Sequence, residues 1–301
     1  MSAAQPSPIG RGQAWVIAAR PKTLTAAVAP VAVGAGLAAH DGAFAALPAA
    51  AALLGAILIQ IGTNFANDYY DFVRGGDTEE RVGPTRVTQA GIIEPDAVQR
   101  AMVIVLGAAM FVGVYLVAIA GWPILVIGLA SVLCAVAYTG GPFPLAYHGL
   151  GDLFVFIFFG LIAVGGTYFV QALAWPPDAL LAGVGLGALS TAILVVNNLR
   201  DIETDTRAGK RTLAVRLGVS GTRVELVALF ALGAVVPIAG WQIYGWPVAS
   251  LTSLMAIPLA VPPVRTAFRY EHPAELIPAL GETARVVVAY GLLLAAGLAL
   301  G

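Results

Sequence analysis

Nine apolar runs separated by short gaps occupy most of this 301-residue chain. Each run is close to the roughly 20 residues that an α-helix needs to cross the hydrocarbon core of a bilayer. Only 11% of the residues are charged, whereas a soluble domain carries about a quarter. The pattern predicts an all-α, polytopic membrane protein with nine transmembrane helices, formed by a single domain over residues 1–301. The runs cover residues 24–39, 44–66, 98–120, 123–139, 152–174, 178–199, 224–244, 246–263 and 284–300.

The basic residues divide the gaps into two kinds. All sixteen lysines and arginines lie in the N-terminal segment 1–22 or in and beside the gaps after the second, sixth and eighth runs. Because short loops rich in Lys and Arg stay on the cytoplasmic side, we expect a cytoplasmic N-terminus, an outside C-terminus and a place in the plasma membrane. One missed helix would break this alternation. The lipid bilayer is an expected partner and nucleic acid is not, while the sequence leaves the oligomeric state open.

Two acidic clusters stand at the ends of apolar runs on the predicted cytoplasmic side, and each has helical spacing. Residues spaced by about one turn share a helix face. Carboxylates at a helix C-terminus oppose the macrodipole, so a cation must compensate them. Mg²⁺ takes oxygen ligands and is commonly held by one or two carboxylates together with substrate phosphates. The clusters are Asn64, Asp68 and Asp71 after the second run, and Asn197, Asp201 and Asp205 after the sixth.

Two such faces that meet in a bundle would hold two or three Mg²⁺ ions. The alternative is that each cluster is a solvated loop end with surface salt bridges, but two matched clusters favour the metal site. Basic side chains near the acids are suited to the outer oxygens of a phosphate. The candidate substrate-binding residues are Asn64, Asn67, Arg74, Arg81, Arg86, Asn197, Asn198, Lys210 and Arg211.

Five stretches carry a resemblance to a known family. They are ARPKTLTAAVAPV (19–31), NFANDYYDFVRGGD (64–77), RVGPTRVTQAG (81–91), YTGGPFPLAYHGLGD (138–152) and NNLRDIETDTRAGKRTLAVRLG (197–218). The pairing of NDYYD with a later D-x-x-x-D resembles the UbiA-type intramembrane prenyltransferases. Within that family the chain looks most like the branch that prenylates 1,4-dihydroxy-2-naphthoate in menaquinone synthesis.

The resemblance implies helices around a central cavity that opens laterally to lipid, with a cytoplasmic cap built from the loops after the second and sixth helices. It implies polyprenyl diphosphate and an aromatic acid as substrates. It also implies Mg²⁺ held by the catalytic acids Asp68, Asp71, Asp201 and Asp205. The chain departs from the family pattern at one position: Gly75 stands where the third acid of the first motif is expected. Asp77, two residues further on, stays a candidate metal ligand.

Two further residues are candidates for the reaction itself. Metal would neutralise the departing diphosphate, and the resulting allylic cation would be attacked by the aromatic ring with loss of CO₂. Tyr138 is a candidate because an aromatic face stabilises a nearby cation, the alternative being ordinary packing. Lys22 is a candidate to contact the diphosphate or the carboxylate of the aromatic acid, the alternative being a snorkelling anchor at the membrane surface.

Three other interpretations compete with this one. A secondary transporter also has many spans and Gly/Pro breaks, but its ion site lies near the midplane, whereas the acids here gather at one membrane face. A phosphatidyltransferase of the CDP-alcohol type has its acids in one stretch, which this chain does not show. A related prenyltransferase with another aromatic acceptor would have the same fold and metal site, so the sequence leaves this alternative open.

Overall fold

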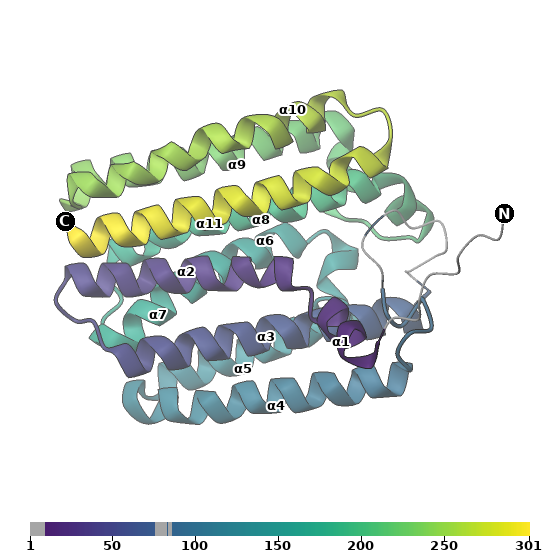
Figure 1. Ribbon diagram of the computed structural model, residues 1–301, viewed down its shortest axis with the longest axis horizontal. Coiled ribbons are helices and arrows are strands. Elements are labelled where there is room, and N and C mark those ends of the chain that lie inside the picture. Colours follow the sequence, from purple (N-terminus) through teal and green to yellow (C-terminus); the bar gives the residue numbers. More distant parts are fainter. Residues whose placement is uncertain (1–9, 76–82, 84–85) are drawn as a thin grey trace.

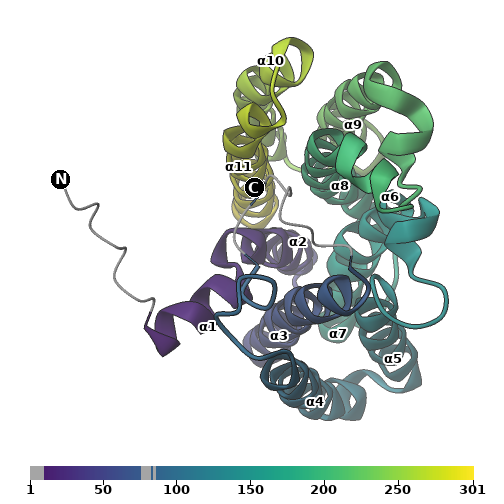
Figure 2. The ribbon, with the colours of Figure 1, turned by 90° about the vertical axis from the view of Figure 1, so that its right-hand side faces the viewer.

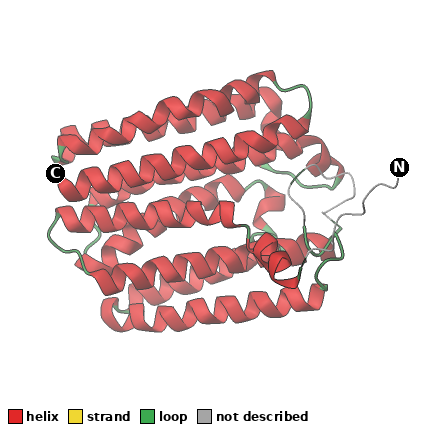
Figure 3. Cartoon of the chain, in the orientation of Figure 1, coloured by secondary structure: helices red, strands yellow, loops and turns green. Residues whose placement is uncertain are grey.

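The computed structural model describes residues 10–75, 83 and 86–301, apart from the side chain of Lys22. Helices dominate the described part, and no strand occurs in it (Figures 1 and 3). In chain order the elements are α1 (Arg11–Ala19), α2 (Pro21–His40), α3 (Ala46–Val73), α4 (Pro95–Ala120), α5 (Trp122–Ala137), η1 (Leu145–His148), α6 (Gly151–Val155), η2 (Phe156–Ile162), α7 (Ala163–Ala172), α8 (Pro177–Arg207), α9 (Leu213–Tyr244), η3 (Val248–Ala260), α10 (Val261–Arg269), η4 (Pro273–Glu275) and α11 (Leu276–Leu300).

The long helices lie side by side in one bundle. Seen end-on, α2, α3, α7, α8 and α11 surround its middle, with α4, α9 and α10 further out (Figure 2). α6, η2 and α7 follow one another without a break, and η2 is a π-helical stretch inside this rod. Proline at the first turn starts α2, α4, α5 and α8, where its missing N–H costs no helical hydrogen bond. The all-α membrane class predicted from the runs is confirmed.

The span count differs from the sequence prediction. Among the described residues, eight helical segments are long and apolar enough to cross a membrane, and the fourth expected span is the shorter α5. Its 16 residues reach about 24 Å at 1.5 Å per residue, less than the roughly 30 Å of a hydrocarbon core. The helix is short because Gly121 stands at its start and a turn with Gly141 at φ +70° follows it closely. The count of nine is therefore not confirmed.

Two helices extend well beyond their apolar runs on the side where the acids lie. α3 continues to Val73 and α8 to Arg207, so each acidic cluster stands on the last turns of a long, continuous helix. The predicted N-terminal segment 1–22 contains the short helix α1. Its Ala14 and Ala18 are buried, and the ring of Trp15 meets that of Phe65 on α3 edge-on at 5.7 Å between centroids.

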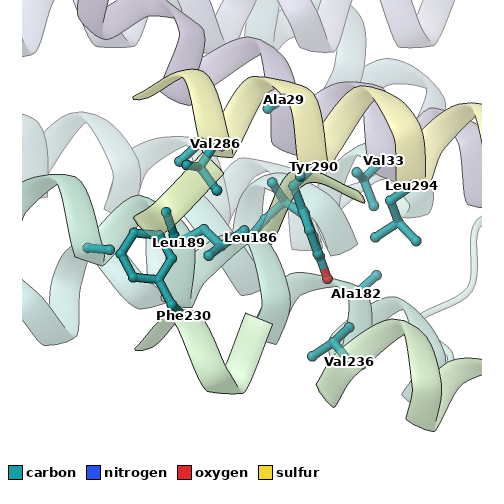
Figure 4. Close-up of a cluster of buried hydrophobic side chains, with 14 of the residues drawn as sticks. Ala29, Val33, Ala182, Leu186, Leu189, Phe230, Val236, Val286, Tyr290 and Leu294 are labelled. Atoms are coloured by element: carbon teal, nitrogen blue, oxygen red, sulfur yellow. The ribbon is translucent and has the colours of Figure 1, made fainter. Parts of the chain in front are cut away.

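The largest apolar core joins α2, α8, α9 and α11 around Tyr290 (Figure 4). The Tyr290 hydroxyl donates to the carbonyl oxygen of Gly233 at 2.9 Å, which satisfies its only polar atom in this core. Glycines let η2 approach α8 closely, as is common between membrane helices. A Cβ at Gly160 would lie 2.6 Å from Cα of Gly187. This contact fixes the position of α8, and α8 carries the second acidic cluster.

Candidate functional site

A cavity of about 900 Å³ lies inside the bundle, lined by α2, α3, α4, α5, η2, α7, α8 and the start of α11. Most of its wall is apolar, with Ile59, Met110 and Phe158 among the lining residues. One end is polar, because the last turns of α3 and α8 reach it with Asp71 and Asp205. The cavity is therefore suited to an elongated molecule with an apolar tail and a charged head.

Asp71 is the centre of the polar end, and its side chain is almost fully buried. Nη2 of Arg86 donates to its Oδ2 at 3.0 Å. The hydroxyl of Tyr147 donates to its Oδ1 at 3.0 Å, and Nζ of Lys210 does so at 3.4 Å. These three partners come from the loop before α4, from η1 and from the loop between α8 and α9. They balance the charge of the carboxylate, and both bases would gain a second anion if a diphosphate entered.

Lys210 joins the two acidic motifs. Its Nζ lies 3.4 Å from Oδ1 of Asp71 and 3.9 Å from Oδ1 of Asp205. Its ammonium also lies over the ring of Tyr147, 4.8 Å from the centroid. A single cation between two carboxylates that are 134 positions apart in the sequence shows that the motifs meet in space. This meeting was a prediction from the sequence, and the described side chains place it at the cavity.

The second motif contains an arginine that the sequence reasoning did not single out. Arg200 is buried and donates to both carboxylate oxygens of Asp201, at 2.7 Å from Nε and 2.6 Å from Nη2. Nη2 also donates to Oδ1 of Asn197 at 2.9 Å. One base thus holds two residues of the motif. Its signal in the sequence was a lone arginine at the end of an apolar run, between Asn198 and Asp201.

The donor set at the polar end fits Mg²⁺. Asp71, Asp201 and Asp205 line it together with the amide side chains of Asn64, Asn67, Asn197 and Asn198. No three His, Cys, Asp or Glu side chains in the described part of the chain stand close enough to hold a metal by themselves. Lys210 stands between Asp71 and Asp205, and Arg200 holds Asp201. One or two carboxylates completed by water and substrate phosphate is the usual environment of Mg²⁺.

Three further predicted residues differ in where they lie. Tyr138 lines the cavity. Asn64 lines it too, but its amide nitrogen donates to the carbonyl oxygen of Ala19 at 2.8 Å and so ties α3 to the end of α1. Arg74 is exposed and donates to the carbonyl oxygen of Gly141.

Three predicted site residues that the structure describes do not line the cavity: Arg74, Arg211 and Asp68. Arg211 is exposed, and its backbone N–H donates to the carbonyl oxygen of Tyr147 at 2.9 Å. Asp68 is buried against a loop. The predictions on Arg81, Asp77 and the side chain of Lys22 lie outside the described residues. Tyr147 was not predicted, although it lies in the stretch YTGGPFPLAYHGLGD, one of the five that carry the family resemblance.

Comparison with known proteins gives a consistent picture. Residues 27–280 match the model of the UbiA prenyltransferase family. The 1,4-dihydroxy-2-naphthoate octaprenyltransferase of Escherichia coli (strain K12) is 38% identical over 96% of this chain and 96% of its own length. The enzyme of that name from Mycobacterium tuberculosis (strain H37Rv) is 40% identical over 95% of this chain and 97% of its own.

Solved structures share the fold at low sequence identity. A UbiA homolog from Archaeoglobus fulgidus bound to DMAPP and Mg²⁺ superposes with a TM-score of 0.62 at 14% identity, over 93% of this chain and 98% of that one. The apo structure of a UbiA homolog from Aeropyrum pernix K1 gives a TM-score of 0.66 at 14% identity, over 89% of this chain and 95% of that one.

Proposed function

Because this chain belongs to the UbiA prenyltransferase family, we propose that it transfers a polyprenyl group from polyprenyl diphosphate to 1,4-dihydroxy-2-naphthoate. Diphosphate and CO₂ leave, and the product is demethylmenaquinone in its quinol form. The observation that carries the proposal is the meeting of both acidic motifs, through Lys210, at the polar end of a long apolar cavity. The near full-length identity with enzymes of that name supports the naphthoate acceptor.

The cavity separates the two ends of the donor. Its apolar wall takes the polyprenyl tail, because apolar side chains surround the tail as well as the interior of the bilayer does. The diphosphate then meets Asp71, Asp201 and Asp205, which would hold Mg²⁺. The metal, when bound, neutralises charge on the leaving diphosphate. Arg86 and Lys210 now contact Asp71 at 3.0 and 3.4 Å, and they would turn to the phosphate oxygens as charge-assisted donors.

Bond breaking between C1 and its oxygen sends the electron pair to the diphosphate and leaves an allylic cation. The ring of Tyr138 lines the cavity and stabilises this cation through its π face. The electron-rich naphthoate ring forms the new carbon–carbon bond. Loss of CO₂ from the ionised carboxyl group returns an electron pair to the ring. The apolar wall excludes water, which would otherwise trap the cation.

The orientation in the membrane follows from the charges. α2 begins at the end of the bundle where the acidic motifs lie, and the C-terminus lies at the opposite end (Figure 1). We place the polar end of the cavity at the cytoplasmic face of the plasma membrane, because the arginines and lysines gather there.

The proposal is tested with purified protein, Mg²⁺, labelled polyprenyl diphosphate and a panel of aromatic acids. We expect a prenylated, decarboxylated product with the naphthoate, and no turnover in Asp71→Asn, Asp201→Asn or Asp205→Asn. Glu203→Gln is the matched control, since Glu203 is an exposed acid between Asp201 and Asp205 and does not line the cavity. Product with a different acid alone, or equal activity in Asp201→Asn and Glu203→Gln, would contradict the proposal.

A further inference from the structure

Asp68 stands one helical turn before Asp71 but faces a different neighbour. It is buried, and the backbone N–H groups of Val87 and Thr88 donate to its Oδ2 and Oδ1, each at 3.2 Å. Both carboxylate oxygens are therefore bound to the loop before α4, while Asp71 lines the cavity. We propose that Asp68 is a positioning residue that holds the segment Arg86–Ile93 against α3 and thereby aims Arg86 at the site. The substrate part of this inference rests on the proposed function.

The segment is a built turn with its own internal bonds. The N–H of Ala90 donates to the carbonyl oxygen of Arg86 at 2.9 Å, and that of Ile92 to the carbonyl oxygen of Val87 at 2.9 Å. Gly91 closes the turn at φ +64°, a value that glycine adopts without strain. The fully buried Val87 side chain packs in an apolar cluster with residues of α1, α3 and α4. The turn therefore has an apolar anchor and a fixed shape.

The internal bonds of the turn leave two buried N–H donors without a backbone partner, and Asp68 accepts a hydrogen bond from each of them. The N–H groups of Val87 and Thr88 point at α3, where water does not reach. Buried backbone donors without a partner are strongly unfavourable. A buried carboxylate also needs donors to replace its hydration. If Asp68 turned to a metal ion, both N–H groups would lose their acceptor, so the segment and the carboxylate depend on each other.

The two hydrogen bonds from the Val87 and Thr88 amides to Asp68 form a clamp. This clamp acts on the site through Arg86. This residue directly precedes the two held amides, and its Nη2 lies 3.0 Å from Oδ2 of Asp71. Holding Val87 and Thr88 therefore fixes where the Arg86 side chain starts. Without the clamp Arg86 would be less well placed for a diphosphate, while the oxygens of Asp71 and Asp205 would still be there for a metal.

Hydrogen exchange on the unmodified protein in detergent tests the clamp without any substitution. The Val87 and Thr88 amides should be protected in the absence of metal. They should remain protected when Mg²⁺ and inorganic diphosphate are added. Loss of this protection on addition would overturn the inference, because it would mean that Asp68 leaves the loop for the metal.

A thiol introduced by Thr88→Cys gives a second readout in a Cys134→Ser background, since position 88 is buried and its backbone N–H is kept. Adding Asp68→Asn should speed maleimide labelling about tenfold or more, because a charge-assisted acceptor is lost. Asp205→Asn, a candidate metal ligand away from this loop, should leave the rate unchanged. Equal rates with and without Asp68→Asn would overturn the inference.

Mn²⁺ binding in the presence of inorganic diphosphate separates the clamp from metal ligation. We expect Asp68→Asn to bind Mn²⁺ within about twofold of the unmodified protein, and Asp205→Asn to bind it about tenfold or more weakly. A loss in Asp68→Asn as large as in Asp205→Asn, with the thiol still protected, would make Asp68 a ligand and refute the inference. None of these measurements needs turnover, so a protein that prenylates no aromatic acid would refute the proposed function alone.

Discussion

Replacing Gly160 with alanine tests whether the packing of η2 on α8 sets the position of the second acidic motif. The new Cβ would lie 2.6 Å from Cα of Gly187 and 2.8 Å from its backbone nitrogen. Carbon atoms in contact stand about 3.5–4.0 Å apart, so η2 and α8 must separate by about 1 Å. The atoms in the way belong to the backbone of α8, and no side-chain rotation relieves the overlap.

The magnitude follows from two opposing effects. Overpacking of this kind typically costs about 1–3 kcal/mol. Alanine is favoured over glycine in a helix by roughly 1 kcal/mol, which offsets part of the cost. Gly166→Ala isolates the second effect, because a Cβ at Gly166 meets nothing within 4 Å. The two variants should therefore differ in free energy of unfolding by about 1–3 kcal/mol, with Gly160→Ala the less stable.

The assay is unfolding of both variants in the same detergent, followed by steady-state turnover. A shift of α8 by about 1 Å would displace Asp201 and Asp205 and lower kcat by up to roughly a hundredfold. Gly166 lines the cavity that takes the prenyl tail, so activity is compared with short prenyl donors. With these donors Gly166→Ala should stay near the activity of the unmodified protein. If Gly160→Ala proved as stable and as active as Gly166→Ala, the close contact between η2 and α8 would not set the geometry of the site.

Three further predictions follow from the site and the charge pattern. Tyr147→Phe removes the 3.0 Å hydrogen bond to Asp71 and keeps the ring; kcat/KM for the donor should fall about tenfold, and an unchanged value would exclude this hydroxyl from the site. Lys22→Ala should raise KM for the aromatic acid about ten- to hundredfold, more than KM for the donor; a rise for the donor alone would assign Lys22 to the diphosphate. In a variant without the native cysteine, thiols introduced by Thr206→Cys and Phe44→Cys should react only from the cytoplasm and only from outside, respectively, and the reverse would overturn the topology.

The sequence determined the class of the protein and pointed to the two acidic motifs of its candidate site. A backbone inside a bilayer must satisfy its own hydrogen bonds, so apolar runs of this length form helices. The acids and amides of both motifs were identified from their spacing, and the family resemblance is confirmed by relatives that match almost the whole chain. The number of spans was less secure, because the length of α5 depends on a turn that follows an apolar run.

Only the tertiary structure decided what each side chain faces. Helical spacing put Asp68 and Asp71 on one face, but three residues correspond to about 60° around the axis. That angle is enough for the loop at Val87 and Thr88 to take one carboxylate and the cavity to take the other. The partners of Asp71 are Arg86, Tyr147 and Lys210. They lie on separate segments, and the spacing of residues along one helix does not show that these segments meet. A periodic pattern shows which residues share a face, whereas the packing of one helix against its neighbours decides where that face points.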